Sequence, residues 1–293
     1  ADRAVFTQDG NQRDKGEWSF SIPDAFSRIV LTGTCKNVFD YTANPLGSNV
    51  VTAAWSNGST ALKGYSVTGI TLTAPVVLSA NYYDDYEFLG KNGIPDDATT
   101  GYSEMSGYGK RYSGGCKGQL TGNWTARLTS QLAGSTYSVM YYDDRYRVIQ
   151  RKGNNSLNGM EAVYTSYNFE GSPVKEKRVH SVPGQDIITE VRNHTYDLAN
   201  RLLQTTYQLN DDAPVILVDN VYDEIGRLKT EKRTGHSKLR TDYTYNLRSW
   251  TKGINGPLFH QTLTYQESID GTTPYYNGNI SSMTWKSGGS AVT

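Results

Sequence analysis

The sequence is short of cysteine, which limits how the chain can be held together. Only two cysteines occur in 293 residues, Cys35 and Cys116, with no CxxC pair and no histidine near either of them. A zinc site, or a scaffold built on many disulfides, is therefore not expected. Two separate buried thiols are favoured over a single bridge between them.

Charge of one sign and long apolar runs are also missing. The chain has 29 basic and 29 acidic residues, so its formal net charge is zero. Its two basic segments, 175–180 and 229–240, are interleaved with Glu176 and Glu231 and fit a solvated strand face. We therefore expect no nucleic-acid partner. No stretch approaches the length of a membrane span, so we do not expect the chain to cross a membrane.

Helical periodicity is nearly absent, and short alternating runs take its place. Examples are "STYSVMYYDD", "APVILVDNVYD" and "HQTLTYQ", and turn pairs such as Asn57-Gly58 and Asn158-Gly159 punctuate the chain. Tyrosine (22) and glycine (29) are abundant, whereas phenylalanine (7) is scarce. Alternating aromatic and β-branched residues between turn signals predict an all-β chain.

One pattern recurs along the chain. From Tyr222 the sequence reads "YDEIGRL". Related segments are "PDAFSRI" from Pro23, "YDDYEFL" from Tyr83, "YDDRYRV" from Tyr142, "YNFEGSP" from Tyr167, "YDLANRL" from Tyr196 and "YNLRSWT" from Tyr245. After Tyr142 the steps between these tyrosines are 25, 29, 26 and 23 residues. A step in the twenties fits two strands and two connections, so the repeat predicts an array of β-hairpins.

The spacing is wider before Tyr142. The first two steps are 60 and 59 residues, which leaves room for about two ordinary units plus insertions in each. We therefore predict an N-terminal β region with divergent units, residues 1–141, and a hairpin array, residues 142–293. The chain opens on "ADRAVFTQDGNQRDKGEW" without a signal peptide, so we expect a segment of a longer polypeptide.

The repeat has a geometric explanation. Asp223 suits the first position of a type I turn, because its carboxylate can accept bonds from backbone N–H groups two residues on, and Gly226 suits the left-handed last position. Tyr222 and Leu228 then lie opposite each other on one face, and Asp223 and Arg227 on the other. Asn200 tolerates the left-handed position in place of glycine. Four other residues tolerate it poorly, so a different turn is expected there: Ser27, Glu87, Tyr146 and Ser249.

A single hairpin of this kind is marginally stable alone. When such hairpins stack edge to edge, their tyrosines and leucines would form a ladder. The ladder would bury the apolar surface that a single hairpin leaves exposed. The residues that we expect to carry the repeat are Tyr142, Asp143, Arg147, Tyr167, Tyr196, Asp197, Arg201, Leu202, Tyr222, Asp223, Gly226, Arg227, Leu228 and Tyr245.

The "YDxxGRL" units resemble the YD repeats of RHS proteins, a family that includes bacterial polymorphic toxins and the teneurin shell. The segments "YDLANRLLQTTYQL", "YDEIGRLKTEKR" and "YNGNISSMTWK" carry most of the likeness, the last resembling RHS-type proteins of Bacteroidetes. The resemblance implies a curved, shell-like sheet that encloses a toxin or effector released by self-cleavage. The final residues, "SGGSAVT", show no DPxG-like terminus, so neither the cleavage chemistry nor a toxin activity is carried over.

No set of residues converges on catalysis. The four histidines lie in separate units without a metal-binding spacing: His180, His194, His236 and His260. The acidic loop "NGIPDDATTG" is the best candidate for an ion site, but it lacks the EF-hand spacing and a solvated loop is favoured. No P-loop and no GxSxG motif occur.

The sequence thus predicts an all-β array of stacked antiparallel hairpins forming a curved, shell-like sheet. The expected role is a non-catalytic scaffold in a large secreted or bacterial cell-surface protein, without cofactor or metal. Its expected partners are the rest of the same polypeptide or an enclosed effector. The alternative is carbohydrate binding through stacking on Trp18, Trp55, Trp124, Trp250 and Trp285, and more weakly a glycoside hydrolase with paired carboxylates.

Overall fold

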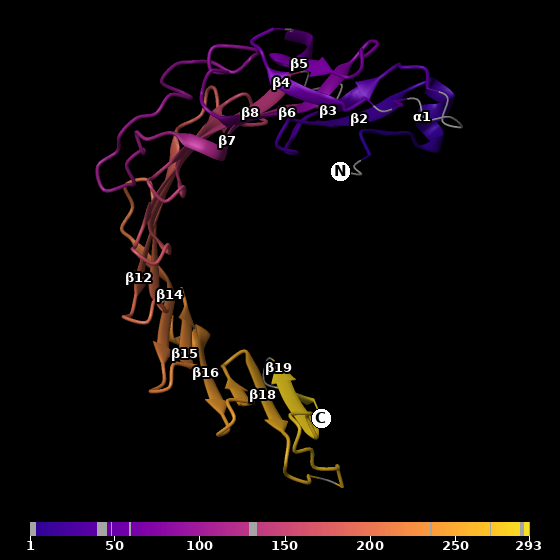
Figure 1. The fold of residues 1–293 in the computed structure, drawn as a ribbon. Helices are drawn as coiled ribbons and strands as arrows, with labels where there is room; N and C mark the ends of the chain where they lie inside the picture. Colours follow the sequence, from indigo (N-terminus) through magenta and orange to yellow (C-terminus); the bar gives the residue numbers. More distant parts are fainter. Residues whose placement is uncertain are drawn as a thin grey trace. The chain divides into compact units, whose positions relative to one another are not determined.

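The computed structural model describes residues 4–39, 46–47, 49–58, 60–128, 134–234, 236–269, 271–287 and 290–292. Its pairings are antiparallel, and the predicted all-β class is confirmed. The helical elements of these ranges are short: α1 (Gly10–Lys15), η1 (Thr60–Leu62) and η2 (Ser237–Leu239). No helix in the described ranges has the length and apolar character needed to cross a membrane. The chain divides into two compact units, each described by itself (Figure 1).

The first unit comprises Ala1–Ser166 and Arg178–Ile188. Neighbouring strands of its main sheet pair in the order β1, β2, β3, β6, β7, β8, β9, β10. Their bounds are Phe6–Thr7, Trp18–Pro23, Ile29–Cys35, Val76–Asp84, Cys116–Ala126, Ser135–Tyr142, Val148–Asn154 and Met160–Tyr167. A separate two-stranded sheet is formed by β4 (Thr52–Trp55) and β5 (Tyr65–Thr68).

Two inserted segments cover this sheet and give the first unit a core. The segment between β3 and β6 contains the β4–β5 hairpin, and Tyr65 of β5 donates its hydroxyl hydrogen to the carbonyl of Asn81 in β6. The segment between β6 and β7 packs Phe88 against Gly122, where a side chain would collide with the ring. The wide steps of the repeat therefore hold two sheet strands and one covering insertion each. The expected insertions are present, but each step holds one unit and not the two for which the spacing leaves room.

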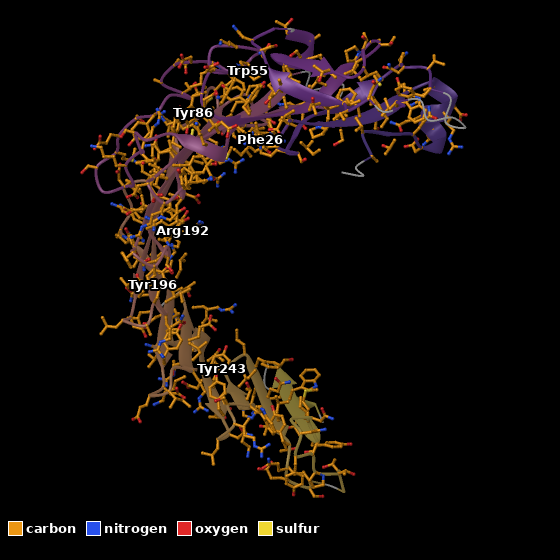
Figure 2. All side chains as sticks on the ribbon, viewed as in Figure 1. Phe26, Trp55, Tyr86, Arg192, Tyr196 and Tyr243 are labelled. Atoms are coloured by element: carbon orange, nitrogen blue, oxygen red, sulfur yellow. The ribbon has the colours of Figure 1, made fainter. Side chains whose placement is uncertain are left out.

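Aromatic rings fill the space between the sheet and its covering segments. Tyr82 stacks on Phe88 with 4.4 Å between ring centroids, and Tyr86 stacks on Tyr141 at 4.8 Å. Tyr141 is 1% exposed, and burial raises its pKa to about 12. Trp55 and Tyr86 lie in this crowded region (Figure 2). The first unit is thus held together as a two-layered domain is, by contacts remote in sequence.

The second unit comprises Tyr167–Lys177 and Thr189–Thr293. Its strands pair consecutively from β12 to β20, each with the next along the chain. They are Ile188–Tyr196, Leu202–Leu209, Val215–Tyr222, Leu228–Arg233, Arg240–Tyr245, Thr251–Asn255, Phe259–Thr264, Ser282–Ser287 and Ser290–Val292. β11 (Pro173–Ser181) belongs partly to each unit. Tyr196 of β12 and Tyr243 of β16 lie in a region of the second unit with sparser side chains (Figure 2).

The first boundary between the two compact units falls between Ser166 and Tyr167, and the chain passes between the units again at 177/178 and 188/189. This division is set by how the residues pack against one another. The division predicted from the sequence, 1–141 and 142–293, follows the regularity of the repeat instead and stays a prediction.

Candidate functional site

The turn at Asp223 is built around one carboxylate. Its Oδ1 accepts from the backbone N–H groups of Ile225 (3.2 Å) and Arg227 (2.8 Å), and its Oδ2 accepts from the Arg227 guanidinium at 2.6 Å. Gly226 donates its N–H to the Asp223 carbonyl and has φ of 91°. Tyr222 is registered opposite Leu228, next to a bulge in β14. This is the geometry that the spacing "YDEIGRL" predicts.

The same set of bonds recurs at other units. At Asp197 the carboxylate accepts from Ala199 N, Arg201 N and Arg201 Nε, at 2.9, 2.9 and 2.6 Å. Asp143 with Arg147, and Asp24 with Arg28, repeat this arrangement, with Nε–Oδ2 distances of 2.7 Å in both. Asn246 and Asn168 replace the carboxylate by an amide oxygen that still accepts backbone N–H groups.

The left-handed position is occupied by more residue types than expected. Ser27, Tyr146 and Ser249 have φ of 66°, 58° and 63° and close the same hydrogen-bonded turn as Gly226. The expectation of a different turn at these residues is therefore wrong. The aspartate or asparagine side chain makes several bonds in each turn, and together these outweigh the cost of about 1–2 kcal/mol for one left-handed residue.

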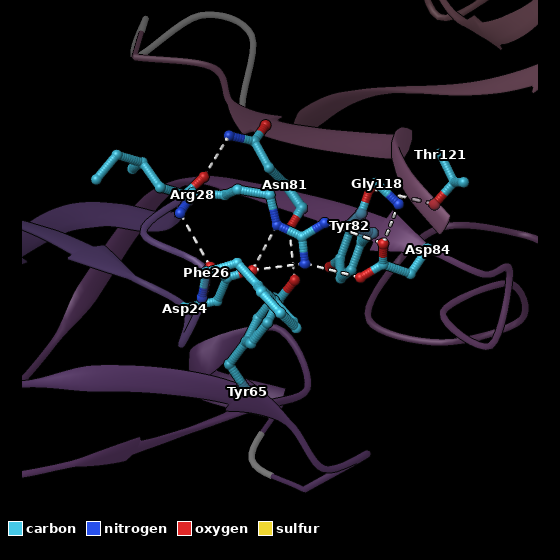
Figure 3. Close-up of polar contacts among 10 residues, drawn as sticks. Asp24, Phe26, Arg28, Tyr65, Asn81, Tyr82, Asp84, Gly118 and Thr121 are labelled. Atoms are coloured by element: carbon cyan, nitrogen blue, oxygen red, sulfur yellow. Dashed lines mark hydrogen bonds and ion pairs between the residues drawn. The ribbon is translucent and has the colours of Figure 1, made fainter. Parts of the chain in front are cut away.

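The unit at Tyr83 is the one that departs from the pattern. Asp84 has φ of 77°, and the chain continues into the covering segment instead of turning into the next strand. The Asp84 carboxylate binds Arg28 of the preceding turn instead, through Nη1 and Nη2 at 2.9 and 2.7 Å (Figure 3). This pairing holds the pKa of Asp84 below its ordinary value.

Tyrosine hydroxyls connect each hairpin to the preceding strand. Tyr222 and Tyr245 donate to the carbonyl oxygens of Leu202 (3.0 Å) and Leu228 (2.8 Å). Tyr196 donates to Pro173 at 2.8 Å. A tyrosine in this position therefore contributes both ring contact and a directed bond. The sequence patterns predicted the ring contact alone.

Arginine side chains make a second connection between neighbouring hairpins. The guanidinium of Arg201 lies over the ring of Tyr222 at 4.8 Å, and that of Arg227 over Tyr245 at 4.7 Å. The sequence predicted that arginine and tyrosine lie on opposite faces. The structure brings the arginine of one turn onto the tyrosine of the next, so the two sets meet. Each such contact is of a kind worth about 0.5–1 kcal/mol at an exposed site.

Trp250 extends this connection beyond the predicted residues. It stands four positions after Asn246, where other turns carry arginine, and its ring packs on Tyr265 at 5.1 Å between centroids. Tyr265 is buried and donates its hydroxyl hydrogen to the Thr251 carbonyl at 2.8 Å. Sequence reasoning missed Tyr265, because glutamine and not aspartate follows it. Its distance of 20 residues from Tyr245 was the available signal.

The predicted tyrosines differ in burial. Tyr142 is 6% exposed, and burial raises its pKa to about 12. Tyr196, Tyr222 and Tyr245 are half-buried, as is Tyr167 at the end of β10. Among these predicted tyrosines, Tyr142 alone is buried in a core.

The tips of the turns expose large apolar side chains. Leu198 and Leu247 are fully exposed, and Phe26, Phe169 and Ile225 are more than two-thirds exposed. The hydrogen bonds that form the turns do not require apolar residues at these positions.

The four histidines of the described ranges have separate partners. His180 pairs with Glu161 at 2.6 Å and His194 with Glu176 at 3.3 Å, while His236 contacts Lys238 N and His260 contacts Thr262. In the described part of the chain no group of three or more His, Cys, Asp or Glu could hold a metal ion. In the acidic loop the Asp97 carboxylate accepts from Thr99 N and Oγ1. Cys35 and Cys116 are separate buried thiols, as favoured from the sequence.

The tryptophans do not form a sugar platform. Trp285 is 37% exposed, Trp124 is buried, and Trp18, Trp55 and Trp250 are half-buried. Trp124 lies under the ammonium of Lys63 at 3.8 Å. Stacking on a sugar would require two or more exposed rings on one surface, and the described tryptophans do not provide this.

Comparison with known proteins finds a distant likeness in solved structures. No family model and no curated protein matches the chain. It is similar to a chain of the crystal structure of TcdB2-TccC3-Cdc42, with TM-score 0.31 and 9% identity, and to a chain of the Photorhabdus luminescens Tc holotoxin pore with a mutated TccC3, with TM-score 0.32 and 10% identity. These matches cover 94% and 98% of this chain, which spans about 15% of the length of those chains.

Proposed function

We propose that this chain is a wall segment of RHS type, a non-catalytic scaffold that encloses or presents another polypeptide. The observation that carries the proposal is a pair of contacts between neighbouring hairpins, here called a double lock, at Tyr222 and at Tyr245. Each ring receives an arginine from the preceding turn, and each hydroxyl binds a carbonyl of the preceding hairpin. Such contacts make every unit depend on its neighbours, as in repeat proteins.

The partner in this proposal is the rest of the same polypeptide or an enclosed effector, in a secreted or cell-surface protein associated with a toxin. A sheet that can be lengthened by adding further units is better suited to a long wall than to a compact pocket for one substrate. The carboxylates of Asp24 and Asp84 are both engaged by Arg28, so these two do not provide the free acid pair that glycoside hydrolysis requires.

The test uses the full natural polypeptide and limited proteolysis. The double variant Arg201→Leu/Arg227→Leu removes two locks while leaving the turn aspartates in place, and Leu198→Ala serves as a control at an exposed tip. We expect segments outside residues 1–293 to become cleavable in the double variant and to stay protected in the control. Equal cleavage of those segments in parent and double variant, with the wall itself loosened, would contradict an enclosing role.

A further inference from the structure

A small cleft in the first unit lies between the turn after β2 and the β4–β5 hairpin. Its volume is about 210 Å³, below the roughly 300–1,000 Å³ of sites for drug-sized ligands. Aromatic rings form much of its lining: Phe26, Trp55, Tyr65 and Tyr83. The cleft is therefore of a size for one side-chain end or a similarly small group.

The polar lining of this cleft carries more negative than positive charge. Asp24, Asp84 and Asp85 line it, and Arg28 is its one basic lining residue. Arg28 binds both Asp24 and Asp84. Asp85 accepts the N–H of Glu87 at 3.0 Å, and no described lysine or arginine nitrogen forms an ion pair with it. Burial raises the pKa of Asp85, and the nearby Lys91 lowers it. A carboxylate without an ion-pair partner beside aromatic walls favours a cationic ligand.

The rings of the cleft already face cations, which shows how they are oriented. Arg28 lies 4.4 Å from the centroid of Tyr83 and 5.1 Å from that of Phe26. The ammonium of Lys91 lies 5.6 Å from the ring of Trp55. Figure 3 shows Arg28 held between Asp24 and Asp84, with Phe26 and Tyr65 close by.

We propose that this cleft binds an alkylammonium or guanidinium group, with Asp85 as its ion-pair partner and Phe26 and Tyr83 as its aromatic walls. The group could be the end of a lysine or arginine side chain in a polypeptide, or a free small cation; both share the same chemistry. The cleft lies wholly in the first unit, so the proposal stands independently of the wall function.

The probe is N-acetyl-arginine amide, with N-acetyl-citrulline amide as a neutral ligand of the same shape. We expect the arginine compound to bind saturably, with Kd of about 1–10 mM for a single group, measured by calorimetry or by chemical shifts. The citrulline compound is expected to bind at least about tenfold more weakly. Equal binding of both compounds, or no saturation by the arginine compound in this range, overturns the proposal.

Two pairs of variants locate the site. Asp85→Asn should weaken arginine binding about tenfold, whereas Asp96→Asn, at an exposed loop position outside the cleft, should not. Phe26→Ala should weaken binding as well, whereas Leu198→Ala, at the tip of an equivalent turn, should not. Melting temperatures establish that each variant is folded. A folded Asp85→Asn variant that binds like the parent overturns the assignment.

The source of the cation is distinguished by a second ligand. A short Gly/Ser peptide with one central arginine offers backbone contacts that the single amino acid lacks. Tighter binding of the peptide than of N-acetyl-arginine amide assigns the cleft to a polypeptide partner. Equal affinity assigns it to a free small cation.

Discussion

The two units use the same repeated turn but obtain their stability differently. All of the buried apolar side chains among the described residues lie in the first unit, except Leu263 and Tyr265. The first unit covers its sheet with inserted segments, whereas the strands of the second unit are mostly half-buried or exposed. Tyr142 is therefore a core residue of the first unit, whereas Tyr196, Tyr222 and Tyr245, in the same repeat position, are half-buried connectors in the second.

The difference shows what the repeat can achieve without a second layer. In the second unit the free energy of the Tyr222 and Tyr245 rungs comes from two contacts, ring on guanidinium and hydroxyl on carbonyl, together with sheet pairing. Each of these terms is about 0.5–1.5 kcal/mol, so stability accumulates along the array and is not concentrated at one position. In the first unit, burial of large rings adds a term that one substitution can remove.

The largest expected effect is loss of a buried ring in the first unit. Phe88 is 2% exposed and is stacked on Tyr82. Phe88→Ala should lower the free energy of unfolding by about 3–5 kcal/mol, because it leaves a cavity under the covering segment. Denaturant titration measures this change, and Leu198→Ala, fully exposed, is the control. A change below 1 kcal/mol would show that the covering segment can collapse onto the sheet.

A smaller loss is expected at a half-buried tyrosine rung of the second unit. Tyr222 is half-buried, so Tyr222→Ala should cost about 2 kcal/mol, less than the roughly 3 kcal/mol expected for a fully buried tyrosine. Tyr222→Phe keeps the ring and removes only the bond to the Leu202 carbonyl, and should cost about 1 kcal/mol. Melting temperatures of both variants separate the ring from the hydroxyl. Parent-like melting of both contradicts the ladder.

Local patterns predicted much of the second unit. The turn at Asp223, the opposition of Tyr222 and Leu228, and the all-β class all follow from residues close together in sequence. The covering segments of the first unit could not be predicted in this way, because Phe88 and Gly122 meet through contacts 34 residues apart. A single sequence contains no signal for such a contact.

The repeated turns also combine features that local sequence predicts with contacts that it does not predict. The bond of an aspartate to the arginine four residues later is local, and the sequence pattern indicates it. The stacking of Arg201 on Tyr222 depends on which hairpins become neighbours and on the rotamer of a long side chain. Residue preference alone does not predict the left-handed Ser249, because it takes no account of the bonds that Asn246 accepts around it.

Two substitutions at the left-handed position of the turn are expected to change stability in opposite directions. Gly226→Ala should destabilise the protein by about 1 kcal/mol, because alanine disfavours φ of 91°. Ser249→Gly relieves the same strain and should stabilise it by a smaller amount, since glycine also gains freedom in the unfolded chain. Chemical denaturation of the two variants under identical conditions tests the pair. Two changes of the same sign would mean that the turns differ in more than this one residue.

The smallest expected effect is a pH dependence in the exposed turns. The Arg201 backbone N–H, and then its guanidinium, lower the pKa of Asp197 below its ordinary value. A carboxyl whose folded pKa is lowered contributes stability above its unfolded pKa of about 3.9, and this contribution is lost as the pH falls through the folded value. Asp197→Asn should therefore be less stable than the parent near pH 7, with the difference shrinking below about pH 4. Thermal melts between pH 3 and pH 7 (roughly the range of this titration) measure the difference, with Asp211→Asn, outside the repeated turns, as control. A gap between Asp197→Asn and the parent that widened on acidification would mean that folding does not favour the charged Asp197 carboxylate, and would contradict the stabilising role of both bonds from Arg201.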